Sequence, residues 1–368
     1  MPVSQFTPGG RDPLSLKPED CGRGHACQFC PQEPECQLDK SFHEKSLLER
    51  RLADIGQIIL VMANKGGVGK STVTANLAIT MSQKGFRVGV ADADIHGPNQ
   101  SRFFGLVGHH VKLTGSGLEA PACFADALPE PIKVASLAFL VETDDTPIVW
   151  RDAYKHDFIH YLIGSFDWGP LDFLFVDMPP GTGNELITLA DLLEGHPTAG
   201  VLATTPQDIA LMDSLKAFRF CQERQMPLIG VVENMAGVTC PHCEQDFHLF
   251  PNAPLEKAMA TMNLPSIGRI PFSPALAMAS DQGNPVALTD PESREAQAFA
   301  MAADACLAHA RSVQMEEAQH ELQHIAETSA DELLADAETL PEELRNDFDA
   351  EALKELLRNE QERLKNRS

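Results

Sequence analysis

The sequence predicts an α/β protein with a doubly wound, mostly parallel sheet, a small Cys-rich N-terminal segment and an acidic helical or disordered C-terminal tail. Two observations carry this prediction: short apolar runs alternate with longer helical segments from residue 58 onward, and a glycine-rich loop follows the first run. Uninterrupted apolar runs are typical of parallel strands buried on both faces, and the intervening segments are long enough for helical crossovers. The predicted strands are Ile58–Ala63, Arg87–Ala91, Lys133–Leu137, Leu171–Val176, Ala199–Thr204 and Leu228–Val232.

The amino-acid composition limits the kinds of partner and the cellular compartment that we expect for this protein. The formal net charge of the 368 residues is -24, which excludes a free-standing nucleic-acid binder because phosphate backbones are held by clustered Lys and Arg. No apolar segment approaches the roughly 18 residues that span a bilayer, and no leader pattern is visible at the N-terminus. We therefore expect a cytoplasmic protein without a membrane partner. In that reducing compartment, tightly spaced Cys residues indicate metal or cluster ligation rather than disulfides.

Shifts in composition divide the chain into three parts. Residues 1–52 are polar and rich in Pro, Gly and Cys, and we expect a metal-organised segment there. Residues 53–312 contain the alternating strand and helix pattern and form the main domain. Residues 313–368 carry 16 Asp or Glu against 6 Lys or Arg, which favours a solvated, partly disordered tail. A partner-docking amphipathic helix at Asp349–Leu364 is the alternative.

The segment from Asn64 to Thr72 predicts a phosphate-binding loop. It lies between the first predicted strand and a helical pattern over Val73–Gln83, as the motif GxxxxGK followed by Ser or Thr requires, with Asn64 in place of the first Gly. Glycines let successive N–H groups point at phosphate oxygens, aided by the positive end of the following helix. We expect Lys70 to reach the terminal phosphates of ATP and Ser71 to ligate Mg²⁺. The nucleotide-binding residues are Gly66, Gly67, Val68, Gly69, Lys70, Ser71 and Thr72.

A second lysine, Lys65, stands near the start of this loop. With it, the loop resembles that of the deviant-P-loop ATPases, the group that contains MinD, ParA and the nitrogenase iron protein. The resemblance implies a homodimer in which Lys65 reaches the nucleotide of the partner subunit.

Three carboxylates follow two predicted strands. Asp92 and Asp94 come after Arg87–Ala91, and Asp177 closes Leu171–Val176. Ligands of open α/β sheets bind at the carboxyl ends of the strands. We expect Asp92 and Asp177 to support Mg²⁺ and Asp94 to orient the attacking water. An Asp pair after a strand is also common as a turn and helix cap, so the first pair alone leaves both interpretations open.

Further motifs narrow the resemblance. The loops Asp92-Ala93-Asp94-Ile95-His96-Gly97-Pro98, Met178-Pro179-Pro180-Gly181-Thr182-Gly183-Asn184-Glu185 and Cys240-Pro241-His242-Cys243 are similar to those of Mrp or ApbC-type iron–sulfur cluster carriers, over about 51–311. The resemblance implies that Asn234 contacts adenine. Asn184 stands where these carriers have Asp and Asn99 where they have Ser, so nucleotide binding is better supported than rapid hydrolysis.

Cys240 and Cys243 form a CxxC. Two thiolates supply half of the four ligands of a tetrahedral zinc or a cubane cluster, and a twofold dimer supplies the rest. The resemblance implies a transient 4Fe-4S cluster bridging two copies. From spacing alone, a bridging zinc, a redox pair and a plain turn remain alternatives.

Four more thiols stand in the N-terminal segment with the spacing C-x5-C-x2-C-x5-C: Cys21, Cys27, Cys30 and Cys36. Four thiols in so short a segment can surround one metal centre, either zinc or an iron–sulfur cluster. Carriers of the eukaryotic Nbp type, which this segment resembles despite a different outer spacing, favour iron. Cys221 and Cys306 lie in helical contexts and are interpreted as core residues.

Together these features predict an ATPase that binds an iron–sulfur cluster and delivers it to apoproteins, in concert with cluster-assembly factors. ATP hydrolysis would be slow and coupled to cluster transfer. Two other hypotheses remain: a MinD/ParA-like positioning ATPase, and a zinc-organised nucleotide-sensing scaffold.

Overall fold

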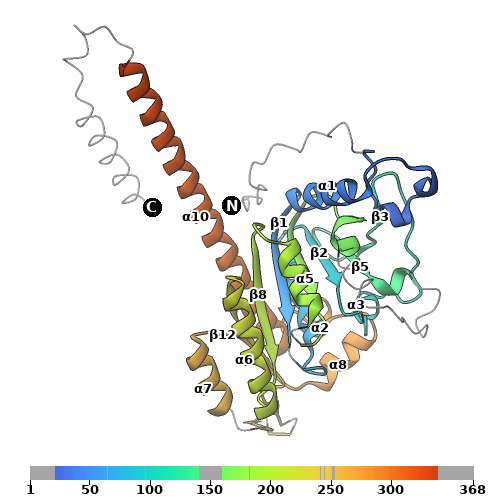
Figure 1. Ribbon diagram of the computed structural model, residues 1–368. Helices are drawn as coiled ribbons and strands as arrows, with labels where there is room; N and C mark the ends of the chain where they lie inside the picture. The colour runs from blue at the N-terminus through green and yellow to red at the C-terminus, as the bar shows by residue number, and fades with distance from the viewer. Residues whose placement is uncertain are drawn as a thin grey trace. The chain divides into compact units, whose positions relative to one another are not determined.

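An eight-stranded sheet lies at the centre of the part of the chain that the structure describes (Figure 1). The computed structural model describes residues 21–63, 65–95, 97–140, 160–181, 183–240, 242–243, 245–250 and 253–338. Neighbouring strands are parallel except β4 and β5, so the predicted fold class is confirmed. In sheet order the strands are β12 (Ser266–Ile270), β9 (Leu228–Asn234), β8 (Thr198–Thr204), β1 (Ile55–Met62), β7 (Leu171–Asp177), β2 (Val88–Asp92), β5 (Ile132–Ser136) and β4 (Ala122–Cys123).

All six predicted strands are present, and the two edge strands are additional. Successive residues of β1 and β7 are buried, which requires cover on both faces of the sheet because side chains alternate between the faces. The helices are α1 (Lys40–Ala53), α2 (Lys70–Gln83), α3 (Gln100–Phe103), α5 (Asn184–Leu192), α6 (Asp208–Glu223), α7 (Ala253–Met262), α8 (Pro274–Asp281), α9 (Val286–Thr289) and α10 (Arg294–Glu338). Two short sheets, β10 (Val238–Thr239) with β11 (Asp246–Phe247) and β3 (Leu118–Glu119) with β6 (Phe166–Asp167), complete the described strands.

The register of the central strands brings the predicted site residues together. Asp177 at the end of β7 is paired with Asp92 at the end of β2 and with Val61 near the end of β1. Because these strands run in parallel, their carboxyl ends meet at one edge of the sheet. The phosphate-binding loop leaves β1 at that same edge.

The N-terminal segment packs against the sheet domain through Arg51 of α1. Its guanidinium donates to Oδ1 of Asp167 at 3.2 Å, to the carbonyl oxygen of Gly24 at 3.1 Å, and to the carbonyl oxygens of Gly164 and Ser116. The backbone N–H of Ala26 also donates to Oγ of Ser165 at 3.1 Å. One side chain therefore ties the backbone near the cysteines to two loops of the domain.

The chain divides into two units, 1–306 and 307–368. Helix α10 begins in the first unit and continues to Glu338 in the second, so the first part of the acidic tail is helical. No Gly or Pro interrupts residues 294–338, which are rich in Ala, Glu and Leu, and these strong helix formers explain the result. The helix predicted at Asp349–Leu364 lies outside the described residues. No helix in the described ranges is long and apolar enough to cross a membrane.

We predict that Arg51→Ala releases the N-terminal segment. The variant leaves three carbonyl groups and Asp167 without their donor, and we expect the free energy of unfolding to fall by about 2–4 kcal/mol. Hydrogen exchange in 21–39 should accelerate at the same time. Arg50→Ala is the matched control, because Arg50 donates to Ser46 on its own helix. Equal effects of the two substitutions would contradict the assignment.

Candidate functional site

The glycine-rich loop between β1 and α2 has the geometry of an anion-binding site. Gly67 and Gly69 have φ angles of +81° and +86°, which residues with side chains rarely adopt. No other group lies within 4 Å of the position that a Cβ would take at Gly66 or Gly67. The loop is therefore open on the side where phosphate oxygens would bind, directly before the N-terminus of α2. Asn64 lies outside the described residues.

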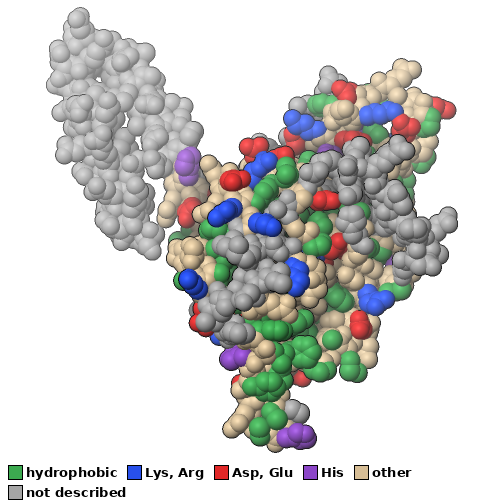
Figure 2. All heavy atoms as spheres, turned by 60° about the horizontal axis from the view of Figure 1, so that its bottom comes forward, with side chains coloured by type: hydrophobic (Ala, Val, Ile, Leu, Met, Phe, Trp, Pro, Cys, Tyr) green, Lys and Arg blue, Asp and Glu red, His purple; other side chains and the backbone are tan. Residues whose placement is uncertain are grey.

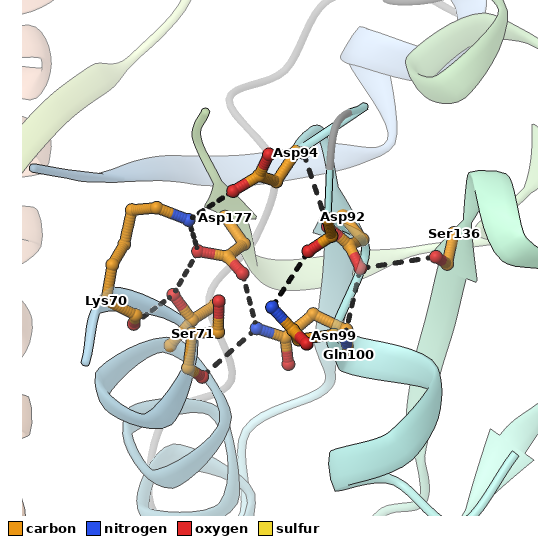
Figure 3. A network of polar contacts seen from close by, with 10 residues as sticks. Lys70, Ser71, Asp92, Asp94, Asn99, Gln100, Ser136 and Asp177 are labelled. Atoms are coloured by element: carbon orange, nitrogen blue, oxygen red, sulfur yellow. Dashed lines mark hydrogen bonds and ion pairs between the residues drawn. The ribbon is translucent and has the colours of Figure 1, made fainter. Parts of the chain in front are cut away.

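Lys70 is buried at the first position of α2 and is held by acidic groups. Its Nζ donates to Oδ1 of Asp177 and lies 3.6 Å from Oδ2 of Asp94 (Figure 3). Although burial alone disfavours the charged amine, the neighbouring carboxylates, Asp177 first, raise the pKa of Lys70. The ammonium group is thus kept charged for a polyphosphate. Ser71 and Thr72 are partly exposed in the same turn.

Asp92, Asp94 and Asp177 surround a single lysine, so the site has more acidic than basic groups. Burial, and then the nearby Asp177, raise the pKa of Asp92 to about 8. Asp92 and Asp177 are fully buried, whereas the side chain of Asp94 is 13% exposed. Two buried carboxylates in register at one sheet edge suit a hard divalent cation with oxygen ligands, so the donor set fits Mg²⁺. Ser71, Asp92 and Asp177 would hold it, and it would offset the charge of the phosphates.

Gln100 of α3 holds these carboxylates in place, and the sequence did not single it out. Its backbone N–H donates to Oδ2 of Asp92 at 2.9 Å, and its Nε2 donates to Oδ2 of Asp177 at 2.8 Å and to the carbonyl oxygen of Ser71 at 3.1 Å (Figure 3). Ser136 of β5 adds a hydroxyl at 3.2 Å from Asp92. Because both partners of the side-chain amide, Asp177 and Ser71, offer acceptor oxygens, the amide nitrogen must face them. Gln100 follows the predicted acidic loop by only a few residues, but a neutral amide gives no distinct sequence signal.

Asn234 at the end of β9 contacts the phosphate-binding loop. Its Nδ2 donates to the carbonyl oxygen of Val68 at 2.8 Å, and its Oδ1 accepts from the backbone N–H of Met235 at 3.0 Å. A Cβ at Gly69 would lie 2.1 Å from this amide nitrogen. The predicted adenine-contacting residue thus lies against the nucleotide loop, and its role toward adenine stays a prediction. Lys65 donates to Oε1 of Gln207 at 3.2 Å within the same chain.

The cysteine pair lies between β10 and β11. Cys243 is exposed and Cys240 partly exposed, and the backbone N–H of Cys240 donates to Gln245 at 2.9 Å. Hydrogen bonds from the backbone N–H groups of His242 and Cys243 lower the pKa of Cys240. The pair is therefore accessible, and one thiol is favoured as a thiolate, the form that binds metals.

The thiol of Cys27 lies within electrostatic range of the other three N-terminal thiols. Burial, then Glu44 and the thiols of Cys36, Cys21 and Cys30, raise the pKa of Cys27 to about 11. Within the described ranges, no three His, Cys, Asp or Glu side chains are already arranged as ligands of one ion. The ligand role of these thiols stays a prediction. Cys221 and Cys306 are buried in the core, as predicted.

The glycine loop, its buried lysine and the two strand-terminal aspartates define a P-loop NTPase. The chain belongs to the ParA family described as NUBPL iron-transfer P-loop NTPases, whose profile matches residues 54–307.

The comparisons with individual proteins agree with this family. The chain is 39% identical to an iron-sulfur cluster carrier protein of Aquifex aeolicus over 68% of its own length and 67% of that protein. It is 34% identical to a cytosolic Fe-S cluster assembly factor Nubp1 homolog of Drosophila pseudoobscura pseudoobscura, over 74% of its own length and 89% of that protein. Among solved structures, a nucleotide-binding protein of Archaeoglobus fulgidus in complex with ADP matches with a TM-score of 0.59 and 32% identity. The match covers 69% of this chain and 96% of that protein.

We predict that the buried Asp92 makes the metal-free, nucleotide-free protein less stable as pH rises. The folded state holds the Asp92 proton up to about pH 8, whereas the unfolded chain loses it near the ordinary value of 3.8, so stability falls across this window. Asp92→Asn removes that effect. Its unfolding free energy relative to the parent should grow by up to about 1.4 kcal/mol per pH unit. Urea denaturation in EDTA at pH 6 and pH 8 measures this, and a pH-independent difference would refute it.

We also predict that Gln100→Leu disturbs the metal-dependent step more than nucleotide binding. With the amide gone, Asp177 loses a donor at 2.8 Å, and Mg²⁺-dependent ATP hydrolysis should fall by about 10–100-fold. Nucleotide affinity without Mg²⁺ should change by less than about threefold, because the loop itself is untouched. Gln83→Leu, which removes a hydrogen bond from the side-chain amide of Gln83 to the carbonyl oxygen of Ala287, is the control. An unchanged hydrolysis rate would show that Gln100 is only structural.

Proposed function

We propose that this chain is an ATP-dependent iron–sulfur cluster carrier that works as a homodimer in the cytoplasm and delivers a 4Fe-4S cluster to apoproteins. The observation that carries the proposal is the short link between the nucleotide loop and the cysteine pair. Asn234 binds the carbonyl oxygen of Val68, and Cys240 follows Asn234 on the same chain after the β10 strand. The names of the relatives, iron-sulfur cluster carrier and Fe-S cluster assembly factor, support the nature of the cargo.

The backbone between Asn234 and the β10–β11 hairpin is held by several contacts. Met235 has a left-handed φ of +56°, and the next residue, Ala236, donates its N–H to the carbonyl oxygen of Ile270 at 2.9 Å. The carbonyl oxygen of Gly237 then accepts from Phe272 at 2.7 Å. A shift of the phosphate-binding loop on nucleotide binding would therefore be passed through Asn234 to the β10–β11 hairpin. This supports coupling between nucleotide occupancy and the presentation of the two thiols.

The surface around the hairpin supports a second copy as the partner. Phe247, Leu249 and Phe272 are between 46% and 48% exposed, although side chains of this size are normally buried. Figure 2 turns this end of the molecule toward the reader and shows hydrophobic side chains on the surface. An isologous contact here would bring Cys240 and Cys243 of two copies together as four ligands and cover the apolar side chains.

The chemistry of the ATP step follows from the positions of four side chains. Lys70 would exchange its ion pair with Asp177 for the terminal phosphates of ATP, and Asp92, Asp177 and Ser71 would hold the metal ion that offsets the phosphate charge. Asp94 is the carboxylate of the three that reaches solvent, which supports its role in orienting the attacking water. Lys65 would cross to the nucleotide of the partner subunit in the dimer. The backbone N–H groups of the glycine-rich loop and the N-terminus of α2 would donate hydrogen bonds to the phosphate oxygens of ATP.

The N-terminal thiols Cys21, Cys27, Cys30 and Cys36 form a second centre in this proposal, holding iron–sulfur or zinc. The electrostatic effect of the other three thiols on Cys27 and the docking of the segment through Arg51 support it. Clients would be apo iron–sulfur proteins, with cluster-assembly factors as donors.

Metal analysis after anaerobic purification tests the cargo. We expect iron and acid-labile sulfide in the parent and no loss in the control Cys221→Ala, whose thiol is buried in the core. If both centres hold 4Fe-4S clusters, Cys240→Ala should lose about one third of the iron, because that cluster is shared by two chains, and Cys27→Ala about two thirds. Zinc alone would favour the nucleotide-sensing scaffold, and absence of both metals the positioning ATPase. Full iron content and transfer in Cys240→Ala would refute the bridging site.

A transfer assay tests the coupling. Lys70→Ala removes the buried ammonium group, so ATP binding should weaken by at least about 100-fold and cluster transfer to an apoprotein should lose its response to ATP. Lys84→Ala, which breaks an exposed ion pair with Asp304, serves as the control. Transfer by Lys70→Ala at the ATP-stimulated parental rate would refute an ATP-dependent carrier.

A further inference from the structure

His43 lies on the face of α1 that covers the N-terminal cysteines. The residue is 2% exposed, and its Nε2 lies 3.0 Å from the carbonyl oxygen of His25. A carbonyl oxygen only accepts hydrogen bonds, so Nε2 carries the proton. In the neutral ring, the lone pair is then on Nδ1.

Nδ1 of His43 faces Sγ of Cys21 at 3.4 Å. Two ligands of one tetrahedral metal ion, with a metal–sulfur bond of about 2.3 Å and a metal–nitrogen bond of about 2.0–2.1 Å, have donor atoms about 3.5 Å apart. The two atoms thus already have the separation of neighbouring ligands. The other ring nitrogen donates to a backbone carbonyl, which is the arrangement that orients ligating histidines in metalloproteins.

The surroundings of this pair are held in place. Gly24, next to His25, accepts from Arg51, and Ala26 donates to Ser165, so the carbonyl oxygen that orients His43 belongs to a fixed backbone. Asp39 caps α1 by accepting from the N–H groups of Ser41 and Phe42, which fixes the helix turn that carries His43. The position of His43 beside Cys21 is therefore fixed by the surrounding hydrogen bonds.

Charge also favours an imidazole donor here. Cys27 already experiences the negative charge of Glu44 and of the other three thiols, and each additional thiolate ligand adds negative charge. An imidazole nitrogen donates a lone pair without adding charge.

We propose that Nδ1 of His43 is a metal ligand beside Cys21, so that the N-terminal centre has mixed thiolate and imidazole ligation. This inference rests on the proposed metal centre of the N-terminal segment and adds a ligand that the Cys spacing does not reveal. On binding, Sγ of Cys21 and Nδ1 of His43 would each donate one electron pair to the same ion, two of the other three thiols would complete its four ligands, and the protons of the ligating thiols would pass to solvent.

The test uses the full chain with Cys240→Ala and Cys243→Ala, so that only the N-terminal centre holds metal. X-ray absorption at the edge of the metal present after anaerobic purification should show one nitrogen in the first shell, lost in His43→Gln. Gln reaches the position of Nε2 and can keep the bond to His25 while removing Nδ1, so a purely structural role would leave the first shell and metal affinity unchanged. An all-sulfur first shell in the parent overturns the proposal, even if the variant does not fold.

A titration with Co²⁺ added to the metal-free chain gives a second readout. His43→Gln should weaken Co²⁺ binding by at least about tenfold, as should Cys21→Ala, while the melting temperature of the metal-free protein stays that of the parent. Unchanged affinity in His43→Gln overturns the proposal. If the parent of this background binds no metal at all, the N-terminal centre and this inference both fail, whereas the assignment of Cys240 and Cys243 is unaffected.

Discussion

The buried contact of Lys70 with Asp177 is the interaction on which the site depends. A lone ammonium group or a lone carboxylate at this depth would be strongly disfavoured, and each group makes the other tolerable. The sheet imposes the geometry, because β1 places the loop that carries Lys70 beside β7, and β7 ends in Asp177 next to Asp92 of β2. One buried site thus contains a positively charged lysine and a larger number of carboxylates. A nucleotide with its metal brings the opposite charges and can replace these internal contacts.

Most of the fold could be predicted because its signals are local. Six strands are continuous apolar runs, and a strand–loop–helix with Gly67, Gly69 and Lys70 has few structural solutions. The carboxyl-edge position of Asp92, Asp94 and Asp177 follows from the same parallel order. The edge strands β4 and β12 were missed because β4 has two residues and β12 is partly exposed, so neither shows the long apolar run of a central strand.

The rest of the site depends on contacts between distant segments. Gln100 reaches Asp177 and Ser71 only because the fold places α3 next to the ends of the central strands. The residues around Gln100 in the sequence do not indicate this contact. Arg51 likewise looks like an ordinary basic residue of a surface helix, yet it donates to carbonyl groups of three segments that are far apart in the sequence. His43 was passed over because a single histidine has no spacing to interpret. The Cys-rich segment looked like an appendage from its polar composition, whereas its backbone is anchored by hydrogen bonds to the sheet domain.

The exposure of the β10–β11 hairpin determines how quickly and how safely a cargo could be handled. Because the thiols project beyond the carboxyl edge of the sheet, an acceptor protein could approach them without any unfolding of the carrier. The same openness admits dioxygen and peroxide, which destroy solvent-accessible clusters. Rapid delivery and sensitivity to oxidation would therefore have a common structural origin, and a cargo held there would be protected chiefly by a short residence time.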